Sequence, residues 1–97
     1  MVRPRICRRV RFRGDFHYFK PQGIRMIDLD ETILAVDEFE AVRLKDLQGL
    51  DQIESAKKMN ISQPTFQRLL QEARKKIADA IVNGKAIRIY GGSYKRD

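Results

Sequence analysis

The sequence has a single cysteine, no tryptophan and only three prolines among its 97 residues. One cysteine forms no internal disulfide, and Cys7 with His17, the one histidine, falls short of the four ligands of a structural zinc site. No apolar run approaches the ~20 residues that a membrane-spanning helix needs, and the arginine-rich start lacks the apolar segment of a secretory signal. These absences argue against a disulfide-stabilised secreted protein and against a membrane partner, so we expect a cytoplasmic protein.

The composition is that of a folded soluble domain, with 42% apolar and 34% charged residues. A chain of this length buries roughly 65% of its unfolded surface, which is enough for one modest core. We therefore expect a single domain that spans residues 1–97.

The charge is unevenly distributed along the chain, whose net charge is +7. Residues 1–25 hold eight basic side chains and one acid, whereas residues 26–54 hold two basic side chains and nine acids. Residues 55–97 hold ten basic side chains and three acids. A polyanion is attracted to the two basic ends and repelled by the acidic middle. This favours one nucleic-acid-binding face over a surface that binds polyanions everywhere.

Residues 3–13 alternate between arginine at most odd positions and apolar side chains at most even ones. This is the period of a β-strand, so residues 1–25 are predicted to form a basic arm or strand. Three of its arginines are expected to contact phosphates or to enter a minor groove: Arg5, Arg9 and Arg11. Alternatively the strand pairs with a C-terminal strand predicted at residues 85–92, within one chain or across a dimer, and both arrangements are compatible.

A first helix is predicted at residues 37–48. Asp37 followed by Glu40 resembles a capping box, and Gly49 is typical of the residue that ends a helix. The apolar residues at helical spacing are Phe39, Val42, Leu44 and Leu47. Short extended segments are also predicted at residues 24–29 and 33–36.

Residues 51–83 carry the signals of two further helices joined by a tight turn. Asp51 begins a short helix over residues 52–59, and Asn60 tolerates the left-handed backbone that such a turn requires. Ser62 begins a longer helix that runs to about Val82, with Pro64 in its first turn, where a missing N–H does no harm.

This arrangement is that of a helix-turn-helix. A small residue where the two helices cross, an apolar plug after the turn and inward apolar groups on the last helix are all present, as Ala56, Ile61, Phe66 and Leu69. The other side of the last helix carries side chains that reach base edges and phosphates in a major groove: Ser62, Gln63, Thr65, Gln67, Arg68 and Gln71. Basic side chains predicted to contact phosphate lie beside them: Lys57, Lys58, Arg74, Lys75 and Lys76.

Motifs distributed over most of the chain resemble those of one protein family. The matching stretches are Pro4-Arg5, Cys7-Arg8-Arg9-Val10, Phe19-Lys20-Pro21, Gly23, Leu34, Asp37 to Asp46, Ala56 to Met59, Ile61-Ser62, Thr65-Phe66, Arg68-Leu69-Leu70, Ala73-Arg74, Gly84-Lys85-Ala86 and Gly91-Gly92. Through them, residues 1–92 resemble an uncharacterised family of small archaeal and bacterial proteins that are predicted to bind DNA. The helix-turn-helix of that family is similar to region four of the bacterial primary sigma factors.

The resemblance implies a role for individual residues of the last helix. It implies that Ser62, Gln63, Gln67 and Arg68 lie against bases. This chain departs from the family pattern at Asn60, where glycine is usual, and at Gln63-Pro64, which give its last helix a face of its own.

Other candidate chemistry finds little support in the sequence. Three acids in four residues, Asp28, Asp30 and Glu31, do not by themselves build an octahedral metal site. His17 has no nucleophile or carboxylate at motif spacing, so acid–base catalysis is not indicated. We expect no enzyme, no metal and no cofactor.

The sequence therefore predicts a mainly α domain of three helices, a helix-turn-helix with short flanking N- and C-terminal β-strands. The predicted function is sequence-specific binding of double-stranded DNA as a transcriptional regulator, with a homodimer reading two half-sites. One alternative is an RNA or single-strand binder that uses the basic arm and its aromatics, Phe16, Tyr18 and Phe19. A second alternative is a protein-interaction module that contacts the transcription machinery through the acidic helix at residues 37–48.

Overall fold

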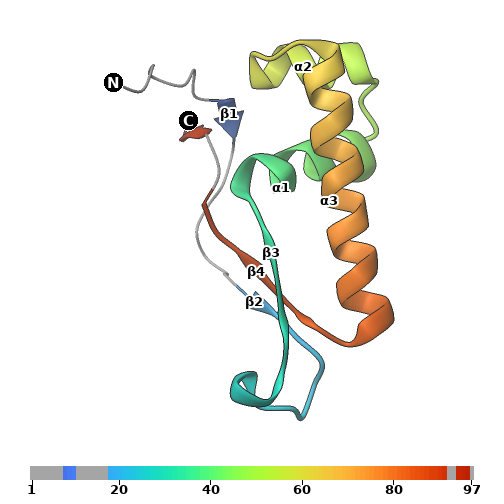
Figure 1. Cartoon of the computed structure of the whole chain (residues 1–97). Helices are drawn as coiled ribbons and strands as arrows, with labels where there is room; N and C mark the ends of the chain where they lie inside the picture. The colour runs from blue at the N-terminus through green and yellow to red at the C-terminus, as the bar shows by residue number, and fades with distance from the viewer. Residues whose placement is uncertain (1–7, 11–17, 92–93, 97) are drawn as a thin grey trace.

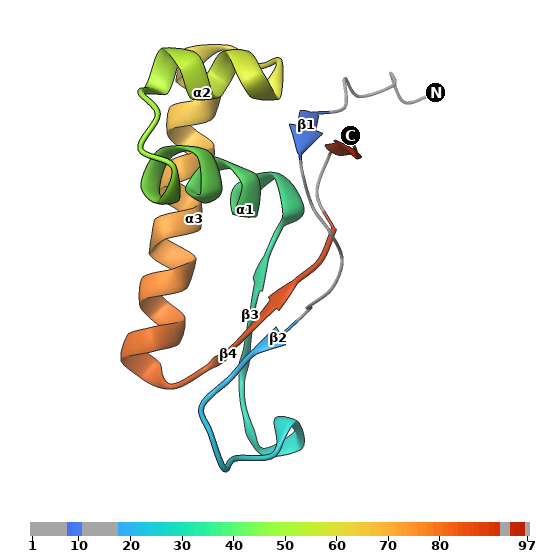
Figure 2. The same cartoon turned by 180° about the vertical axis from the view of Figure 1, so that it is seen from behind.

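The computed structural model describes residues 8–10, 18–91 and 94–96, and these form a mainly helical protein with a small sheet (Figure 1). The helical elements are the 3-10 turn η1 (Met26–Asp28), α1 (Val36–Val42), the π-helical turn η2 (Arg43–Leu47), α2 (Gln52–Met59) and α3 (Gln63–Asn83). The strands are β1 (Arg8–Val10), β2 (Tyr18–Phe19), β3 (Glu31–Leu34), β4 (Ala86–Ile89) and β5 (Tyr94–Arg96). Figures 1 and 2 show α3 along one side of the strands β2, β4 and β3, with α1 and α2 beside its N-terminal half.

Strand pairing differs in part from the sequence prediction. The central strand β4 pairs antiparallel with β2 and parallel with β3, and the short strand β1 pairs in parallel with β5. Within the predicted basic arm, Tyr18–Phe19 thus pair with the strand expected at residues 85–92, whereas Arg8–Val10 do not and pair with β5 instead. Alternation along a strand fixes its two faces but not its partner, and both edges of β4 are already taken by β2 and β3. The extended segment predicted at residues 24–29 is also wrong in part, since Met26–Asp28 form a 3-10 turn.

The first helix begins differently from the prediction. Asp37 is not the residue that begins it: the helix starts at Val36, and the Glu38 carboxylate accepts a hydrogen bond of 2.9 Å from the backbone N–H of Ala35. The helix then passes into the π-helical turn η2, and this turn changes the spacing of side chains around the axis. Leu47, the last of the apolar residues that the sequence places at helical spacing, lies in this turn and is 79% exposed.

The two following helices have the predicted starts and turn. The Asp51 carboxylate accepts a hydrogen bond of 2.7 Å from the Glu54 N–H, and the Ser62 hydroxyl accepts one of 3.3 Å from the Thr65 N–H. Asn60 has the expected left-handed backbone, with φ of 59°, and Gly84 ends α3 with φ of 65°. The turn between α2 and α3 therefore rests on local chemistry that the sequence shows directly.

One core joins the helices to the sheet. Its largest fully buried side chains include Phe66 and Leu70 on α3, Leu44 on η2 and Met59 on α2. Burying an apolar side chain of this size stabilises the fold by about 1.5–3 kcal/mol. Two apolar residues of these helices do not take part in the core: Ile53 on α2 is 65% exposed and Ile81 on α3 is 73% exposed.

Asp79 ties the C-terminal half of α3 to the sheet. Its carboxylate accepts hydrogen bonds from the Thr32 hydroxyl at 3.2 Å, the Lys85 amine at 2.9 Å and the Asn83 amide at 2.6 Å. The hydrogen bond from Lys85 is the main reason that the pKa of Asp79 lies below its ordinary value, and the same bond raises the pKa of Lys85. Through Thr32 and Lys85, these contacts attach the C-terminal half of α3 to β3 and to the residue that precedes β4.

Candidate nucleic-acid interface

The polar side of the first turns of α3 is open to solvent. Ser62, Gln63, Arg68 and Gln71 are exposed, and Thr65 is half-buried. The opposite side of the same turns carries Phe66, which is fully buried in the core. Packing on one side thus holds the helix while its polar side stays accessible.

Side-chain hydrogen bonds arrange the beginning of this face. The Ser62 hydroxyl donates a hydrogen bond of 2.9 Å to the Thr65 hydroxyl, which also accepts one of 3.3 Å from the Arg68 guanidinium. In the described part of the chain Arg68 pairs with no carboxylate, so its positive charge is not neutralised. The first turn of α3 contains no acidic residue either. This end of the helix is therefore suited to an anion.

Gln67 differs from its neighbours on this face. The residue is half-buried, and its Oε1 atom is buried with no hydrogen-bond donor. The sequence placed Gln67 with the exposed side chains, whereas in the structure its carboxamide oxygen lies beneath the surface. An unsatisfied acceptor of this kind costs about 1–3 kcal/mol, which favours a conformation that meets a donor.

Three of the predicted phosphate contacts are exposed and have no carboxylate partner among the described residues. Lys57 and Lys58 lie in the last turn of α2, and Lys75 lies on α3. A cation is favoured at the C-terminal end of a helix, and among the described residues none of these three amines pairs with a carboxylate. They remain available to an external anion.

Arg74 is instead committed to an intramolecular contact. Its guanidinium donates two hydrogen bonds to the Asp46 carboxylate, with distances of 3.0 and 2.5 Å. These hydrogen bonds are the largest cause of the raised pKa of Arg74 and of the lowered pKa of Asp46. Because 28 residues separate the two partners, the sequence offered no signal for this pair.

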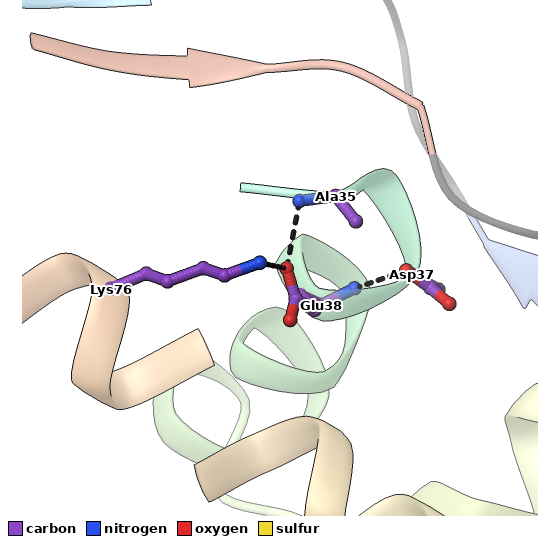
Figure 3. A network of polar contacts seen from close by, with 4 residues as sticks. All are labelled: Ala35, Asp37, Glu38 and Lys76. Carbon is purple, nitrogen blue, oxygen red and sulfur yellow. Dashed lines mark hydrogen bonds and ion pairs between the residues drawn. The ribbon is translucent and has the colours of Figure 1, made fainter. Parts of the chain in front are cut away.

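Lys76 is committed in a similar way (Figure 3). Its amine donates a hydrogen bond of 2.7 Å to the Glu38 carboxylate, whose Oε1 atom also accepts the Ala35 N–H. Next to it, the Asp37 carboxylate accepts a hydrogen bond of 2.9 Å from the Glu38 N–H. The network attaches the start of α1 to the middle of α3, so Lys76 holds the scaffold rather than facing solvent freely.

The predicted N-terminal contacts are only partly placed. Arg5 and Arg11 lie outside the described residues, whereas Arg9 belongs to β1 and is paired in register with Lys95 of β5. The β1–β5 pair lies beside α1 and α2 in both views (Figures 1 and 2), and β1 contacts both helices. The fold thus brings basic residue types from both ends of the chain to the side of α2.

The described residues offer neither a metal site nor a membrane-spanning helix. They contain no group of three or more His, Cys, Asp or Glu residues placed to hold a metal ion. None of the helices in this part of the chain is long and apolar enough to cross a membrane.

The chain is similar to known bacterial proteins over nearly its whole length. A family model described as "Protein of unknown function DUF134" matches residues 1–97. A UPF0251 protein from Moorella thermoacetica is 55% identical over 94 residues, which cover 97% of this chain and 63% of that protein. A UPF0251 protein from Thermoanaerobacter pseudethanolicus is 56% identical over 95 residues, which cover 98% of this chain and 80% of that protein.

The comparison with solved structures found no match. The two relatives described above both come from bacteria. On the family match and these identities, the chain belongs to the DUF134 family.

Proposed function

We propose that this protein binds double-stranded DNA sequence-specifically and regulates transcription, with the N-terminal half of α3 lying in the major groove. The observation that carries the proposal is the two-sided character of these turns. Phe66 and Leu70 are buried in the core, while Ser62, Gln63, Arg68 and Gln71 are exposed on the other side. A helix held in this way presents short polar, amide and guanidinium groups to a groove of its own width.

The exposed side chains match the chemistry of base edges. A glutamine amide pairs with the N6 and N7 atoms of adenine, and an arginine guanidinium pairs with the O6 and N7 atoms of guanine. Gln63, Arg68 and Gln71 are the best placed for such contacts because they are exposed. Ser62 and Thr65 then contact bases or the nearby backbone, and Gln67 joins them if its carboxamide turns outward.

Phosphate contacts are assigned to the exposed amines. Lys57, Lys58 and Lys75 have no intramolecular carboxylate among the described residues. Arg74 and Lys76, which the sequence added to this set, are left out of the proposal because Asp46 and Glu38 already hold them. The N-terminal arginines, Arg5, Arg9 and Arg11, remain a predicted contact of the basic arm.

The proposal treats α2, its turn and α3 as a helix-turn-helix similar to sigma factor region four. Two observations support this assignment. Asn60 has a left-handed backbone in the turn, and Ala56 is only 3% exposed on α2, the helix that packs against α3. A homodimer is part of the proposal because one α3 reads few base pairs, and a two-fold pair doubles the site. Sedimentation of the free protein and of its complex with DNA measures that stoichiometry.

The protein-interaction alternative is less favoured by the geometry. It depends on an acidic surface of the first helix, but Asp37, Glu38 and Glu40 are at most 6% exposed. Glu40 is bound by Arg43 at 2.6 and 2.7 Å. The nearby exposed acid, Asp46, is held by Arg74.

Selection from random duplexes, followed by sequencing of the retained fraction, tests the proposal most directly. The expected result is an enriched sequence whose affinity falls in Arg68→Ala and Gln63→Ala. Gln48→Ala is the matched control, because Gln48 is an exposed glutamine on another part of the molecule. No enriched sequence, or equal losses in the control, would contradict sequence-specific binding.

A further inference from the structure

Arg88 lies between two tyrosines on the three-stranded sheet. Its guanidinium carbon is 5.7 Å from the centre of the Tyr18 ring and 5.0 Å from the centre of the Tyr90 ring. Tyr18 is paired in register with Arg88 across β2 and β4, and Tyr90 follows Arg88 by two residues. The three side chains therefore lie on the same face of the sheet, where we refer to them as the sheet platform.

The sheet platform faces away from α3. Thr32 and Leu34 are the buried residues of β3, and the Thr32 hydroxyl contacts Asp79 of α3, so these residues mark the inner face. The residues between them, Glu31 and Ile33, are exposed, and Ile33 is paired in register with Arg88. Figures 1 and 2 show α3 on one side of these strands, so α3 does not cover the platform side.

The platform offers flat, accessible groups and an uncompensated charge. Tyr90 is 61% exposed and Tyr18 is 43% exposed. No carboxylate of the described residues pairs with Arg88, and its guanidinium lies against the faces of the two rings. A guanidinium plane and tyrosine rings are the groups on which unpaired bases stack.

We propose that the sheet platform binds single-stranded nucleic acid, with unpaired bases stacking on Tyr18 and Tyr90 and Arg88 attracting the strand. Only unpaired bases can do this, because in a duplex the flat faces of the bases are hidden between neighbouring pairs. The proposal does not depend on duplex binding by α3, which uses a different side of the molecule.

The charge around the platform sets where the strand lies. Exposed Glu31 lies on the same face, beside Ala86 in the register of β3 and β4, and repels phosphates from that end. The backbone is therefore expected to run along the Arg88 and Tyr90 side. Because stacking accepts any base, the site has little sequence preference.

The test measures binding of the whole protein to an oligothymidylate of about 15 nucleotides by fluorescence anisotropy. We expect Tyr18→Ala with Tyr90→Ala to weaken binding about tenfold or more, and Tyr18→Phe with Tyr90→Phe to leave it unchanged. Leu47→Ala is the control, since Leu47 is an exposed apolar residue away from the platform. Unchanged affinity in the double alanine variant overturns the proposal.

Arg88 separates stacking from simple attraction of phosphate. Arg88→Lys keeps the charge but loses the plane, so we expect weaker binding in Arg88→Lys and still weaker binding in Arg88→Gln. Full affinity in Arg88→Lys together with no effect of the tyrosines would show a phosphate contact only, which overturns the proposal.

Tyrosine fluorescence gives a readout that does not depend on a variant that folds poorly. Adding the oligonucleotide should quench the fluorescence of the unmodified protein, and the quenching should be lost in the double phenylalanine variant, which still binds. Arg68→Ala should retain oligothymidylate binding while it loses duplex binding, so the failure of one proposal is distinguishable from the failure of the other.

Discussion

Arg74 on α3 and Asp46 on η2 form a two-hydrogen-bond ion pair that spans the outside of the helical layer. The pair is partly exposed, with 52% of the Arg74 side chain and 37% of the Asp46 side chain accessible. Solvent screens an exposed contact of this kind. The pair therefore contributes little to the free energy of unfolding, although both of its hydrogen bonds have favourable distances. It explains why a basic residue on α3 need not be a DNA contact.

Replacing Asp46 tests this pair. Asp46→Ala should lower the free energy of unfolding by at most about 1 kcal/mol, because the pair is partly exposed. It should also release Arg74 and thereby increase non-specific DNA affinity. Urea denaturation and a titration with random-sequence duplex measure both effects, and a loss well above this limit would show that the pair is more than a screened surface contact.

The same pair predicts a dependence of stability on pH. The pKa of Asp46 is lowered in the folded state, chiefly by the hydrogen bonds from Arg74. Its contribution to stability is therefore fully present above the unfolded pKa of about 3.9 and is lost as the pH falls through the lower, folded pKa. Unfolding at about pH 7 and about pH 3 should show a larger acid loss in the wild type than in Asp46→Asn, and equal losses would contradict the assignment.

Base contacts and phosphate contacts should give different signatures in DNA binding. Arg68→Ala should reduce the preference for the selected sequence by about 1–3 kcal/mol, whereas Lys75→Ala should weaken all sequences alike. Lys75→Ala should also make the log–log dependence of affinity on salt shallower by about 0.9, the value for one phosphate. Identical effects of the two variants on every sequence would contradict a base contact by Arg68.

Replacing Gln67 should change both the stability of the fold and the binding of DNA. The buried Oε1 atom of this side chain has no donor, so Gln67→Met, which removes the acceptor at similar volume, should raise the free energy of unfolding by up to about 1 kcal/mol. If the carboxamide turns outward to a base, the same variant also loses about 1–3 kcal/mol of sequence preference. Thermal unfolding and duplex titration separate the two, and a clear loss of stability would show that the oxygen has a partner in solution.

Replacing Phe66 tests whether the exposed polar side of α3 depends on the core beneath it. Phe66→Ala leaves a cavity below the first turns of α3 and should cost about 3–5 kcal/mol of stability, because Phe66 is fully buried. That loss is a large share of the stability of a small domain, so DNA binding should disappear with folding. Circular dichroism and urea denaturation check this, and a native-like stability would mean that the side chain does not lie in the core.

Elements that depend on local signals could be predicted from the order of the residues alone. Asp51 and Ser62 accept the backbone hydrogen bonds that start α2 and α3, and Asn60 takes the left-handed turn between them. Each of these contacts joins residues a few positions apart, so spacing alone predicts it. The exposed polar side of α3 follows in the same way, because the apolar spacing around Phe66 fixes which side is buried.

The packing of the whole fold brings together segments that lie far apart in the chain. It pairs β1 with β5, places Asp46 against Arg74 and Glu38 against Lys76, and sets Arg88 between Tyr18 and Tyr90. The alternating pattern of a strand does not predict which strand pairs with it, and a charged residue on a helix does not predict which residue forms its ion pair. Those choices depend on how the layers pack, since a long-range contact forms only where the whole fold brings its two groups within reach.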